Sequence, residues 1–367
     1  MPEKFVNEYV PEVVSPPGET LHEILEDRGM SQAELAERMG RPKKTINEIV
    51  RGKAELTPET ALQLERVLGV PSPFWGNLER NYRDNLARAA ERARLKEHGA
   101  WPNTFPIAQM AKLGWIEQKS SSVEMVASLL DFFGVTSVEK WRTCYGEPAA
   151  VFRLPKRFKP SIPALAAWLR QGERMAQDIE CGEFDGNAFS AALVEARRLT
   201  TEEDIAALQT ALPDLSSKSG VAVVFVPELK GSRACGATRW LSPQKALIQL
   251  SLRYKTDDHL WFTFFHEAGH ILLHGKRDSF VEGNGGWGDE EKEDEANRFA
   301  ADHLITRARM DELLALSPFT RPKVRAFARR IGVAPGIVVG RLQHDRQLPF
   351  THLNDLKRSY RWVHDDD

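Results

Sequence analysis

Two histidines and a glutamate stand within one helical turn in the stretch His266-Glu267-Ala268-Gly269-His270. Positions i and i+4 of a helix share one face, so the two imidazoles can converge on one ion while Glu267 lies beside it. A helix holds a hydrolytic zinc in this way, with one further protein ligand and a fourth position kept for water. The pattern therefore predicts His266 and His270 as zinc ligands and Glu267 as the general base.

The flanking residues predict that this motif lies on a buried helix. Residues 259–274 are apolar nearly all round, as is typical of a core helix. Gly269 disfavours a helix by about 1 kcal/mol relative to Ala, which predicts close packing by another element there. For any single histidine, the alternative is a core side chain satisfied by hydrogen bonds. Polar groups keep to one stripe, spaced by three or four residues: His259, Thr263, His266, His270 and His274.

A third ligand is expected on a second helix, over residues 292–306. Glu293 shares a face with apolar residues at i+3 and i+7, so it points to the core, where an unpaired carboxylate is costly. We therefore predict Glu293 as the third ligand, with Glu295 and His303 as alternatives. The other acids between Asp289 and Glu295 are expected to form a solvated face.

These residues resemble the ImmA/IrrE family of bacterial metallo-endopeptidases. The family signature is an HExxH helix followed by ExxAxxFA, which stands here at residues 293–300, and the resemblance continues through residues 331–345. It implies a gluzincin site, with His266, His270 and Glu293 on the metal and Glu267 as base. For several relatives, the substrate is a helix-turn-helix repressor cut at one place.

Whole-chain properties bound the class of protein. A length of 367 residues with 42% hydrophobic content suffices for two or three cores. The net charge of −2 gives no general attraction to nucleic acid, so any DNA contact must come from a local patch. The 3 cysteines, Cys144, Cys181 and Cys235, are too widely spaced for a disulfide framework or a cysteine zinc site. No export signal or membrane-length apolar run is evident, so we expect a cytoplasmic protein without a membrane partner.

A second group of motifs lies near the N-terminus. Ser31 and Glu34 form a capping box, and Gly40 ends the helix that follows. After a tight turn, residues 42–51 predict the next helix, and Thr57 caps another in front of a proline. Two short helices joined by a glycine-containing turn match the geometry that places a helix in the major groove of DNA.

The second of these helices carries cationic and amide side chains. Lysine and arginine can contact phosphates or guanine, and Asn47 can read adenine. The alternative is a plain three-helix bundle with a solvated basic face. The predicted DNA-binding residues are Gln32, Lys43, Lys44, Thr45, Asn47 and Arg51.

Residues 16–69 resemble the Xre/HigA group of DNA-binding domains, antitoxins among them. The resemblance implies a double-stranded operator as partner and self-association, because such operators are usually read by dimers. Arg41-Pro42 departs from the group, which usually has a Ser or similar cap at this turn.

An amphipathic helix is expected to follow, with Ser72 as its cap and an end near His98. Its apolar residues recur at helical spacing between Trp75 and Ala93, so it packs on the bundle or on its twin in a dimer. The central region is mostly helical, with apolar periodicity in residues 123–133, 162–179 and 189–199 and a helix capped at Thr201.

Strand-like runs at 221–226, 234–241 and 246–252 precede the histidine helix, and an exposed edge strand can align an extended peptide. Residues 320–346 read as two helices, which either pack around the histidine helix or form a second helix-turn-helix. Spacing identifies no partner for the oxyanion of peptide hydrolysis, and the candidates are Arg253, Tyr254, His274 and His344.

The sequence thus predicts a multi-domain, mainly α protein with a small β-sheet. An all-α helix-turn-helix bundle (1–98) precedes a helical spacer or sensor (99–212), an α+β zincin-like peptidase domain (213–350) and a tail (351–367). The predicted function is an antitoxin-like DNA-binding regulator carrying a zinc endopeptidase that cuts itself, a repressor or a toxin. The alternatives are a non-enzymatic antitoxin or sensor that uses the peptidase fold as scaffold, and a protease whose bundle binds protein.

Overall fold

The structure, a computed structural model, describes residues 15–147, 161–274 and 290–362. It divides into two compact units, Met1–Gly99 and Ala100–Asp367, and each is described by itself. No helix within the described ranges has the length and apolarity that crossing a bilayer requires. Asp289 of the acidic run and residues 363–367 of the expected tail lie outside these ranges.

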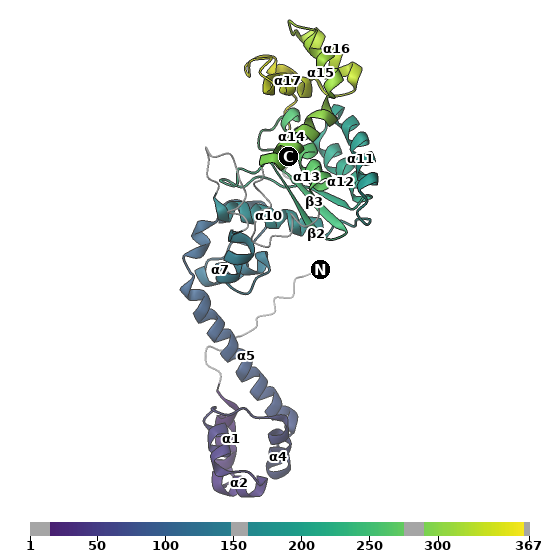
Figure 1. The fold of residues 1–367 in the computed structure, drawn as a ribbon. Coiled ribbons are helices and arrows are strands. Elements are labelled where there is room, and N and C mark those ends of the chain that lie inside the picture. The colour runs from purple at the N-terminus through teal and green to yellow at the C-terminus, as the bar shows by residue number, and fades with distance from the viewer. Residues whose placement is uncertain (1–14, 148–160, 275–289, 363–367) are drawn as a thin grey trace, which may run out of the picture. The chain divides into compact units, whose positions relative to one another are not determined.

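The first unit is all-α, as predicted (Figure 1). Large apolar side chains from all of its helices meet in one core, which includes Leu21, Leu35, Ile46, Leu64 and Trp75, each 0% exposed. The helices are α1 (Pro17–Asp27), α2 (Gln32–Met39), α3 (Lys43–Val50), α4 (Pro58–Leu68) and α5 (Ser72–Glu97).

The predicted helix ends are largely confirmed. Ser31 Oγ accepts a hydrogen bond from the Glu34 N–H at 3.1 Å, and Thr57 caps α4 in the same way. Gly40 ends α2 with φ of 63°, a left-handed conformation that glycine adopts without strain. The capping box is only half formed, because the Glu34 carboxylate bonds Arg38 at 2.7 Å.

The second unit is helical around a small sheet. Its first part contains η1 (Trp101–Thr104), α6 (Ile107–Lys112), α7 (Ser122–Phe133), α8 (Val138–Trp141), η2 (Arg142–Gly146), α10 (Ile162–Gln177), α11 (Gly186–Arg198), η3 (Leu199–Thr201) and α12 (Ile205–Ser217). The strands are β1 (Val221–Phe225), β2 (Gly236–Ser242) and β3 (Lys245–Leu250). They are followed by α13 (Asp257–Leu273), α14 (Glu290–Leu304), α15 (Arg307–Leu314), α16 (Arg321–Ile331), α17 (Pro335–His344) and η4 (Asn354–Leu356).

Two predicted caps were wrong. Ser72 is the first residue of α5 and makes no side-chain cap; its N–H donates to the Glu65 carboxylate instead. Thr201 belongs to η3, and the cap of α12 is Asp204, whose Oδ1 accepts from the Ala206 N–H at 2.9 Å. Before α12, several residues able to cap stand close together, and the sequence pattern does not choose among them.

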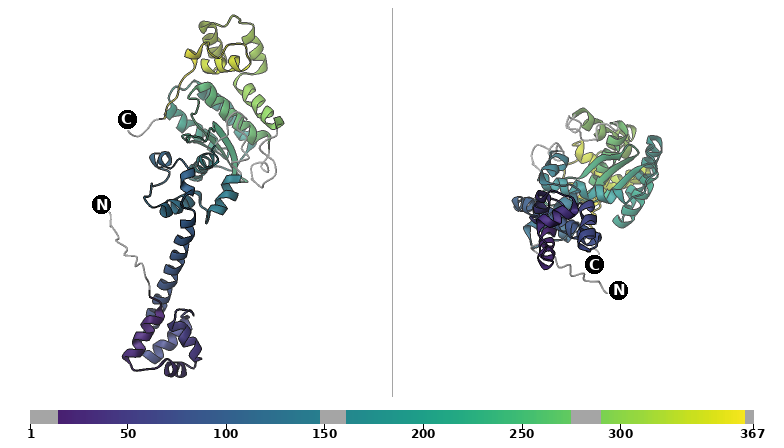
Figure 2. Two further views of the ribbon diagram at one scale, coloured as in Figure 1. Left: turned by 90° about the vertical axis from the view of Figure 1, so that its left-hand side faces the viewer. Right: turned by 90° about the horizontal axis from the view of Figure 1, so that it is seen from below.

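The sheet has the strand order β1-β3-β2. β1 runs parallel to β3, and β2 runs antiparallel to it, with Val223 and Thr238 both opposite Ile248. Because successive side chains of a strand point to opposite faces, the sheet separates two cores. Helix α13 covers one face and α10 the other (Figure 1 and Figure 2). Val221, Val223 and Phe225 join the α13 core, and Ala222, Val224 and Val226 join the α10 core.

Helices from the region 99–212 belong to both cores. α10 packs on one face of the sheet, and α12 packs against β1. The spacer and the peptidase region therefore share one compact unit, and their division at residue 212 stays a prediction about roles.

Helix α17 packs against α13, and its two glycines permit the contact. A Cβ on Gly336 would overlap the Asp257 carboxylate, and one on Gly340 would overlap that of Asp258. Lys357 Nζ pairs with Asp258 Oδ2 at 2.6 Å. Most of α17 is buried, so the structure favours packing around the histidine helix over a second DNA-reading helix.

Residues that we expected to form a tail close on the second core. The Asp257 N–H donates to Arg358 O at 3.0 Å, and the Tyr360 N–H donates to Lys255 O at 2.7 Å. Tyr360 is 2% exposed. The prediction of a tail from residue 351 was wrong because the sequence does not show these backbone hydrogen bonds between distant segments.

The buried Asp257 predicts a stability change with pH. Burial, aided by the nearby negative charge of Asp258, raises the pKa of Asp257 from 3.8 to about 6. The folded state thus holds this proton more tightly than the unfolded chain, so the free energy of unfolding falls as pH rises from about 4 to 6. Asp257→Asn should raise that energy by about 1–3 kcal/mol at pH 7 and change little at pH 4.

Calorimetric unfolding of both proteins at the two pH values tests this expectation. The groups facing Asp257 are Asp258, Arg358 and Tyr360, and they are the same in both proteins. A wild type as stable as the variant, or more stable, at pH 7 would contradict the assigned cost of the buried charge.

Candidate functional site

The site forms where α14 crosses close to α13. A Cβ on Gly269 would lie 3.1 Å from Phe299 Cδ1 and 3.3 Å from Ala296 Cα. This confirms the close packing predicted at Gly269. The contact brings the first turn of α14 to the face of α13 that carries His266 and His270.

The structure brings together the three predicted metal ligands. His266 Nε2 and His270 Nε2 are 3.0 Å apart. Glu293 Oε2 lies 3.3 Å from His266 Nε2, and Glu293 Oε1 lies 3.5 Å from His270 Nε2. The three ligand atoms all lie within 4.8 Å of one another, the arrangement that a metal ion would require.

The two alternative third ligands make other contacts. Glu295 Oε2 lies 3.1 Å from His274 Nε2, on the side of His274 that faces away from His270. His303 donates from Nδ1 to Phe299 O at 3.0 Å, and its ring packs on Phe265 and Phe299. The geometry therefore favours Glu293, whose carboxylate alone of these groups approaches both histidines.

The donor set fits a zinc ion. Zinc–nitrogen bonds of about 2.0–2.1 Å in a tetrahedron place two ligand atoms about 3.3 Å apart, close to the separations of 3.0, 3.3 and 3.5 Å found here. Glu267 is 6% exposed, and its Oε2 has no hydrogen-bond partner within the described part of the chain. A buried oxygen without a hydrogen-bond partner in the described residues, on a carboxylate that interacts with the charge of His266, is compatible with a further polar group there.

Electrostatics assigns different protonation states to these groups. Burial, then the positive charge of His266, lower the pKa of His270 to about 4, so this ring is neutral at pH 7. Burial also lowers the pKa of His266, but the hydrogen bond to Glu293 and the charges of Glu267 and Glu293 outweigh it and leave the pKa raised. The hydrogen bond from His266 lowers the pKa of Glu293.

Glu267 differs from Glu293 in its surroundings. Burial raises the pKa of the Glu267 carboxyl, although the charge of His266 opposes the shift. A base works best when its pKa is close to the working pH, so this shift suits a group that takes a proton from water and returns it. Gly236 makes room for this carboxylate, because a Cβ there would lie 2.8 Å from Glu267 Oε1.

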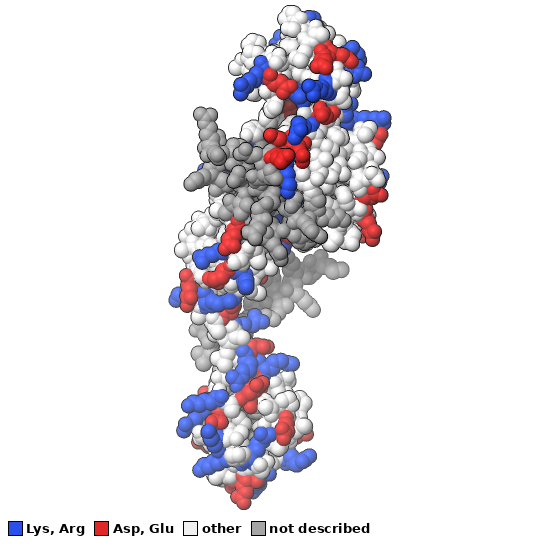
Figure 3. All heavy atoms as spheres, in the orientation of Figure 1, with Lys and Arg blue, Asp and Glu red and all other residues white. Residues whose placement is uncertain are grey.

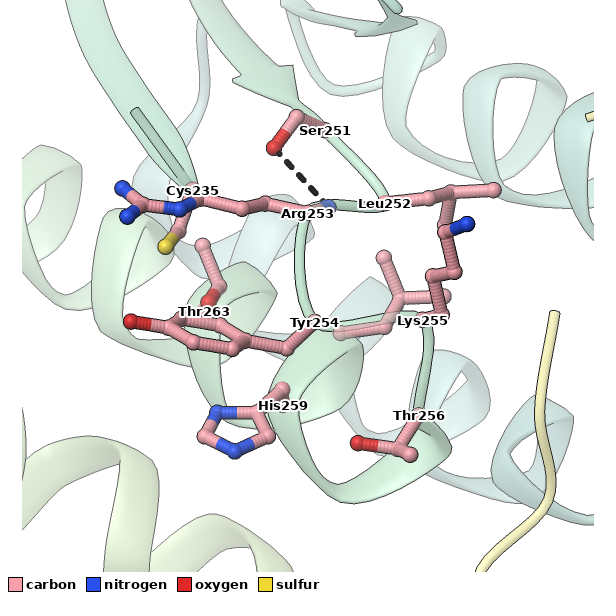
Figure 4. A pocket seen from close by; sticks show the side chains of 10 residues that line it. Cys235, Ser251, Leu252, Arg253, Tyr254, Lys255, Thr256, His259 and Thr263 are labelled. Carbon is pink, nitrogen blue, oxygen red and sulfur yellow. Dashed lines mark hydrogen bonds between the residues drawn. The ribbon is translucent and has the colours of Figure 1, made fainter. Parts of the chain in front are cut away.

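A small pocket beside the first half of α13 contains two of the oxyanion candidates (Figure 4). Its volume of about 10 Å³ is enough for one water. Tyr254 stacks on His259 with 4.3 Å between ring centroids, and Arg253 lies 5.4 Å from the Tyr254 ring. His259, which the sequence placed in the polar stripe, thus lies outside the group of metal ligands.

The other two candidates lie elsewhere. Both nitrogens of His274 contact other side chains, His270 at 2.9 Å and Glu295 at 3.1 Å, so His274 is poorly placed to bind an oxyanion. His344 stacks on Phe262, which in turn stacks on His266. No contact singles out one group, and the oxyanion partner stays a prediction.

The tight crossing at Gly269 gives a prediction for metal binding. Gly269→Val should push α14 away from α13, carry Glu293 with it, and weaken zinc binding by about 10–100-fold. Gly269→Ala is the matched control, because Phe299 and the Ala296 backbone need yield only a few tenths of an ångström. Competition with a chromogenic chelator measures both affinities, and wild-type affinity in the valine variant would show that the crossing does not position Glu293.

The predicted DNA-binding residues gather on α3 and the start of α2. Lys43, Lys44 and Arg51 are exposed, and Thr45 is half-buried beside them. Asn47 Nδ2 donates to Gln32 Oε1 at 3.3 Å, so the amide predicted to read adenine contacts a second predicted DNA-binding residue. α3 buries Ile46 and Ile49, so its polar side faces away from the core.

Charges of both signs are intermixed over the first unit on the side in view (Figure 3). The side in view is therefore not uniformly basic. This agrees with the expectation from the net charge of −2 that any DNA contact would come from a local patch.

Some contacts of the candidate metal ligands were not predicted. Asn297 Oδ1 lies 3.0 Å from His266 Nδ1, and His274 lies 2.9 Å from His270. The spacing of four residues from His270 to His274 placed them on one face, but nothing in the sequence showed which nitrogen each would use. Gly236 gave no signal, because its role depends on a contact between distant segments.

Comparison with known proteins supports both halves of this description. A family model named Helix-turn-helix matches residues 21–75, and one named IrrE N-terminal-like domain matches residues 229–343. An uncharacterized HTH-type transcriptional regulator, YddM, from Escherichia coli strain K12 is 36% identical over 63 residues, covering 17% of this chain and 67% of its own length.

Solved structures that are similar to part of this chain include an addiction module antidote protein of a HigA family from Coxiella burnetii. It is 28% identical, with 23% of this chain and 92% of that chain covered and a TM-score of 0.21. Pseudomonas aeruginosa antitoxin HigA with its higBA promoter is 33% identical, with 21% of this chain and 86% of that chain covered and a TM-score of 0.21. The chain therefore belongs to the helix-turn-helix transcriptional regulators through its Xre/HigA-like N-terminal domain and carries a C-terminal domain of the IrrE/ImmA type.

Proposed function

We propose that this regulator carries a zinc-dependent endopeptidase that hydrolyses a peptide bond in a regulatory protein. The observation that carries the proposal is the convergence of His266 Nε2, His270 Nε2 and a Glu293 oxygen within 4.8 Å of one another. Glu267 lies next to His266 on α13, buried and with an unpaired oxygen. A metal bound only for structure would not need such a base.

His266, His270 and Glu293 would hold the zinc. A zinc with an open position lowers the pKa of bound water to about 7 and polarises a carbonyl oxygen. Glu267 takes a proton from the attacking water and delivers it to the leaving amine, since its pKa is raised by burial. The burial of Glu267, which is 6% exposed, keeps bulk water from its carboxylate and strengthens its interactions with a substrate.

The sheet supplies a place for an extended substrate. β2 lies at one edge of the described sheet, and α13 packs against it. β2 begins at Gly236, which lies against the Glu267 carboxylate. A peptide that adds to this edge as a further strand would therefore pass the proposed base. This arrangement favours a protein substrate with an unfolded segment: a repressor, a toxin or the chain itself.

The N-terminal domain would place α3 in the major groove of a double-stranded operator. Leu86 of α5 is 45% exposed and Leu62 of α4 is 58% exposed, so apolar surface remains for a second copy of the domain. We propose a homodimer, which sedimentation of the purified chain would test. A protein that reads operator DNA works where the DNA is, so we place it in the cytoplasm.

The endopeptidase proposal can be tested by identifying the new protein N-termini that appear in cells expressing this protein. We expect one or a few cleavage products in cells expressing the wild type, lost with Glu267→Gln and restored in vitro by purified protein with zinc. Zinc bound at one ion per chain, with identical N-termini in both cell lines, would favour a non-enzymatic antitoxin or sensor.

The presence of both motifs in one chain suggests that proteolysis and repression are coupled. If so, operator binding by Glu267→Gln should persist under conditions that release the wild type from DNA. Identical binding and repression by both proteins under every activating condition would leave no coupling to explain.

A further inference from the structure

A continuous line of side-chain contacts runs through the site and joins His266, His270, His274 and Glu295. His266 Nε2 faces His270 Nε2 at 3.0 Å, His270 Nδ1 faces His274 Nδ1 at 2.9 Å, and His274 Nε2 faces Glu295 Oε2 at 3.1 Å. His274 is 8% exposed, so its ring has few alternatives to these contacts. The line thus joins a surface carboxylate to the two facing imidazoles.

Proton counting fixes the direction of these hydrogen bonds. A carboxylate oxygen accepts, so His274 Nε2 is the donor of its 3.1 Å contact with Glu295 Oε2. In an imidazole with one N–H, His274 Nδ1 then accepts, so His270 Nδ1 is the donor of the 2.9 Å contact between them. His270 Nε2 is left with a lone pair directed at His266 and Glu293, where the proposed metal lies.

We propose that Glu295 and His274 form a positioning relay that holds His270 in its Nδ1–H tautomer, with Nε2 prepared for the metal. The benefit of the relay for metal binding rests on the proposed function, but its contacts involve only side chains of this protein. Hydrogen bonds to the second nitrogen of a ligating histidine orient the ring and increase its basicity, and their loss typically weakens metal binding by about 10–100-fold.

The same logic applies to His266 with a shorter connection. Its Nδ1 lies 3.0 Å from Asn297 Oδ1, so a single amide fixes this tautomer directly. Asn297 lies on α14 one turn after Glu293, and Glu295 lies between them in sequence. α14 therefore contributes one ligand and the two outer groups that orient both histidines of α13.

The relay assigns roles that differ from those first considered for its members. His274 was an oxyanion candidate and Glu295 an alternative metal ligand. Both nitrogens of His274 are engaged, and the Glu295 carboxylate contacts the outer nitrogen of His274. Neither group reaches the position between His266, His270 and Glu293.

The direct test is the tautomer of His270 in the metal-free full chain, read from its imidazole nitrogen chemical shifts in a ¹⁵N-histidine-labelled sample. The relay predicts a proton on Nδ1 in the wild type. It predicts loss of this preference in His274→Leu and retention in His274→Asn, whose Oδ1 can accept the same hydrogen bond. A wild-type His270 protonated on Nε2 would overturn the proposal.

Zinc affinity, measured by chelator competition, provides the second readout. We expect about 10–100-fold weaker binding in His274→Leu, a smaller loss in Glu295→Ala, and near-wild-type binding in His274→Asn. Adding Glu295→Ala to His274→Asn should cost nothing further, because the asparagine needs no carboxylate to set its acceptor. His22→Leu, at an exposed histidine on α1, is the control.

These outcomes separate the relay from the proposed function. If the wild type binds no zinc, the endopeptidase proposal fails, while the tautomer measurement still decides the relay. If His274→Leu is folded by circular dichroism and binds zinc like the wild type, the relay is wrong. Should His274→Leu fail to fold, Glu295→Ala with the tautomer measurement decides, because Glu295 is 44% exposed and its loss leaves the core intact.

Discussion

Glu267→Gln should lower kcat/KM for the cleaved protein by about 10²–10⁴-fold, the usual contribution of a positioned general base. The amide has nearly the same shape as the carboxylate, so it fits the space beside Gly236, but it cannot take a proton from water. Zinc affinity should stay within a few-fold of the wild type, because Glu267 is not one of the three converging groups. Initial rates on the substrate found in cells, together with metal content, provide the measurement.

A matched control is Glu312→Gln, a half-buried acid on α15 that pairs with Arg309 and Arg330 away from the site. It should retain full activity. Activity within tenfold of the wild type in Glu267→Gln, at equal zinc content, would show that another group acts as base.

Asn47→Ala should lower affinity for the specific operator by about 1–3 kcal/mol, or roughly 5–150-fold, and leave non-specific duplex binding nearly unchanged. The amide is held by Gln32 in a half-buried position, so its removal loses a pre-oriented base contact. Lys44→Ala should instead weaken binding to all duplexes and reduce the slope of log affinity against log salt by about one. Fluorescence anisotropy over a salt series measures both effects.

Lys230→Ala changes an exposed cation of the second unit and should leave the salt slope intact. If Asn47→Ala weakened specific and non-specific duplexes equally, Asn47 would not be a base-reading residue. If neither variant changed affinity for any duplex, the bundle would not use α3 to contact DNA.

Much of the metal centre could be predicted because it depends on local periodicity. If the segment is helical, the spacing of His266 and His270 places them on one face. Gly269 in the helix interior indicated that another element packs closely there. The face pattern of a second amphipathic helix favoured Glu293 as the third ligand and left Glu295 and His303 as alternatives. The small sheet was also predictable, since its strands are short, largely apolar runs.

Features that depend on contacts between distant segments could not be predicted. The relay depends on the contact of Glu295 with His274 Nε2. The spacing along α14 does not show which of Glu293 and Glu295 would make that contact. Tyr360 reads as part of a polar tail until its backbone bond to Lys255 is known. Glu34 bonds Arg38 because a long cation one turn away competes with the capping geometry.

The measurement that tests the central claim most directly is the coordination shell of zinc in the full-length chain, by anomalous diffraction or X-ray absorption. The account predicts one zinc per chain, bound by nitrogens of His266 and His270 at about 2.0–2.1 Å, by an oxygen of Glu293, and by a water in the fourth position. Absence of zinc under saturating conditions, or a shell closed by four protein ligands, would contradict it.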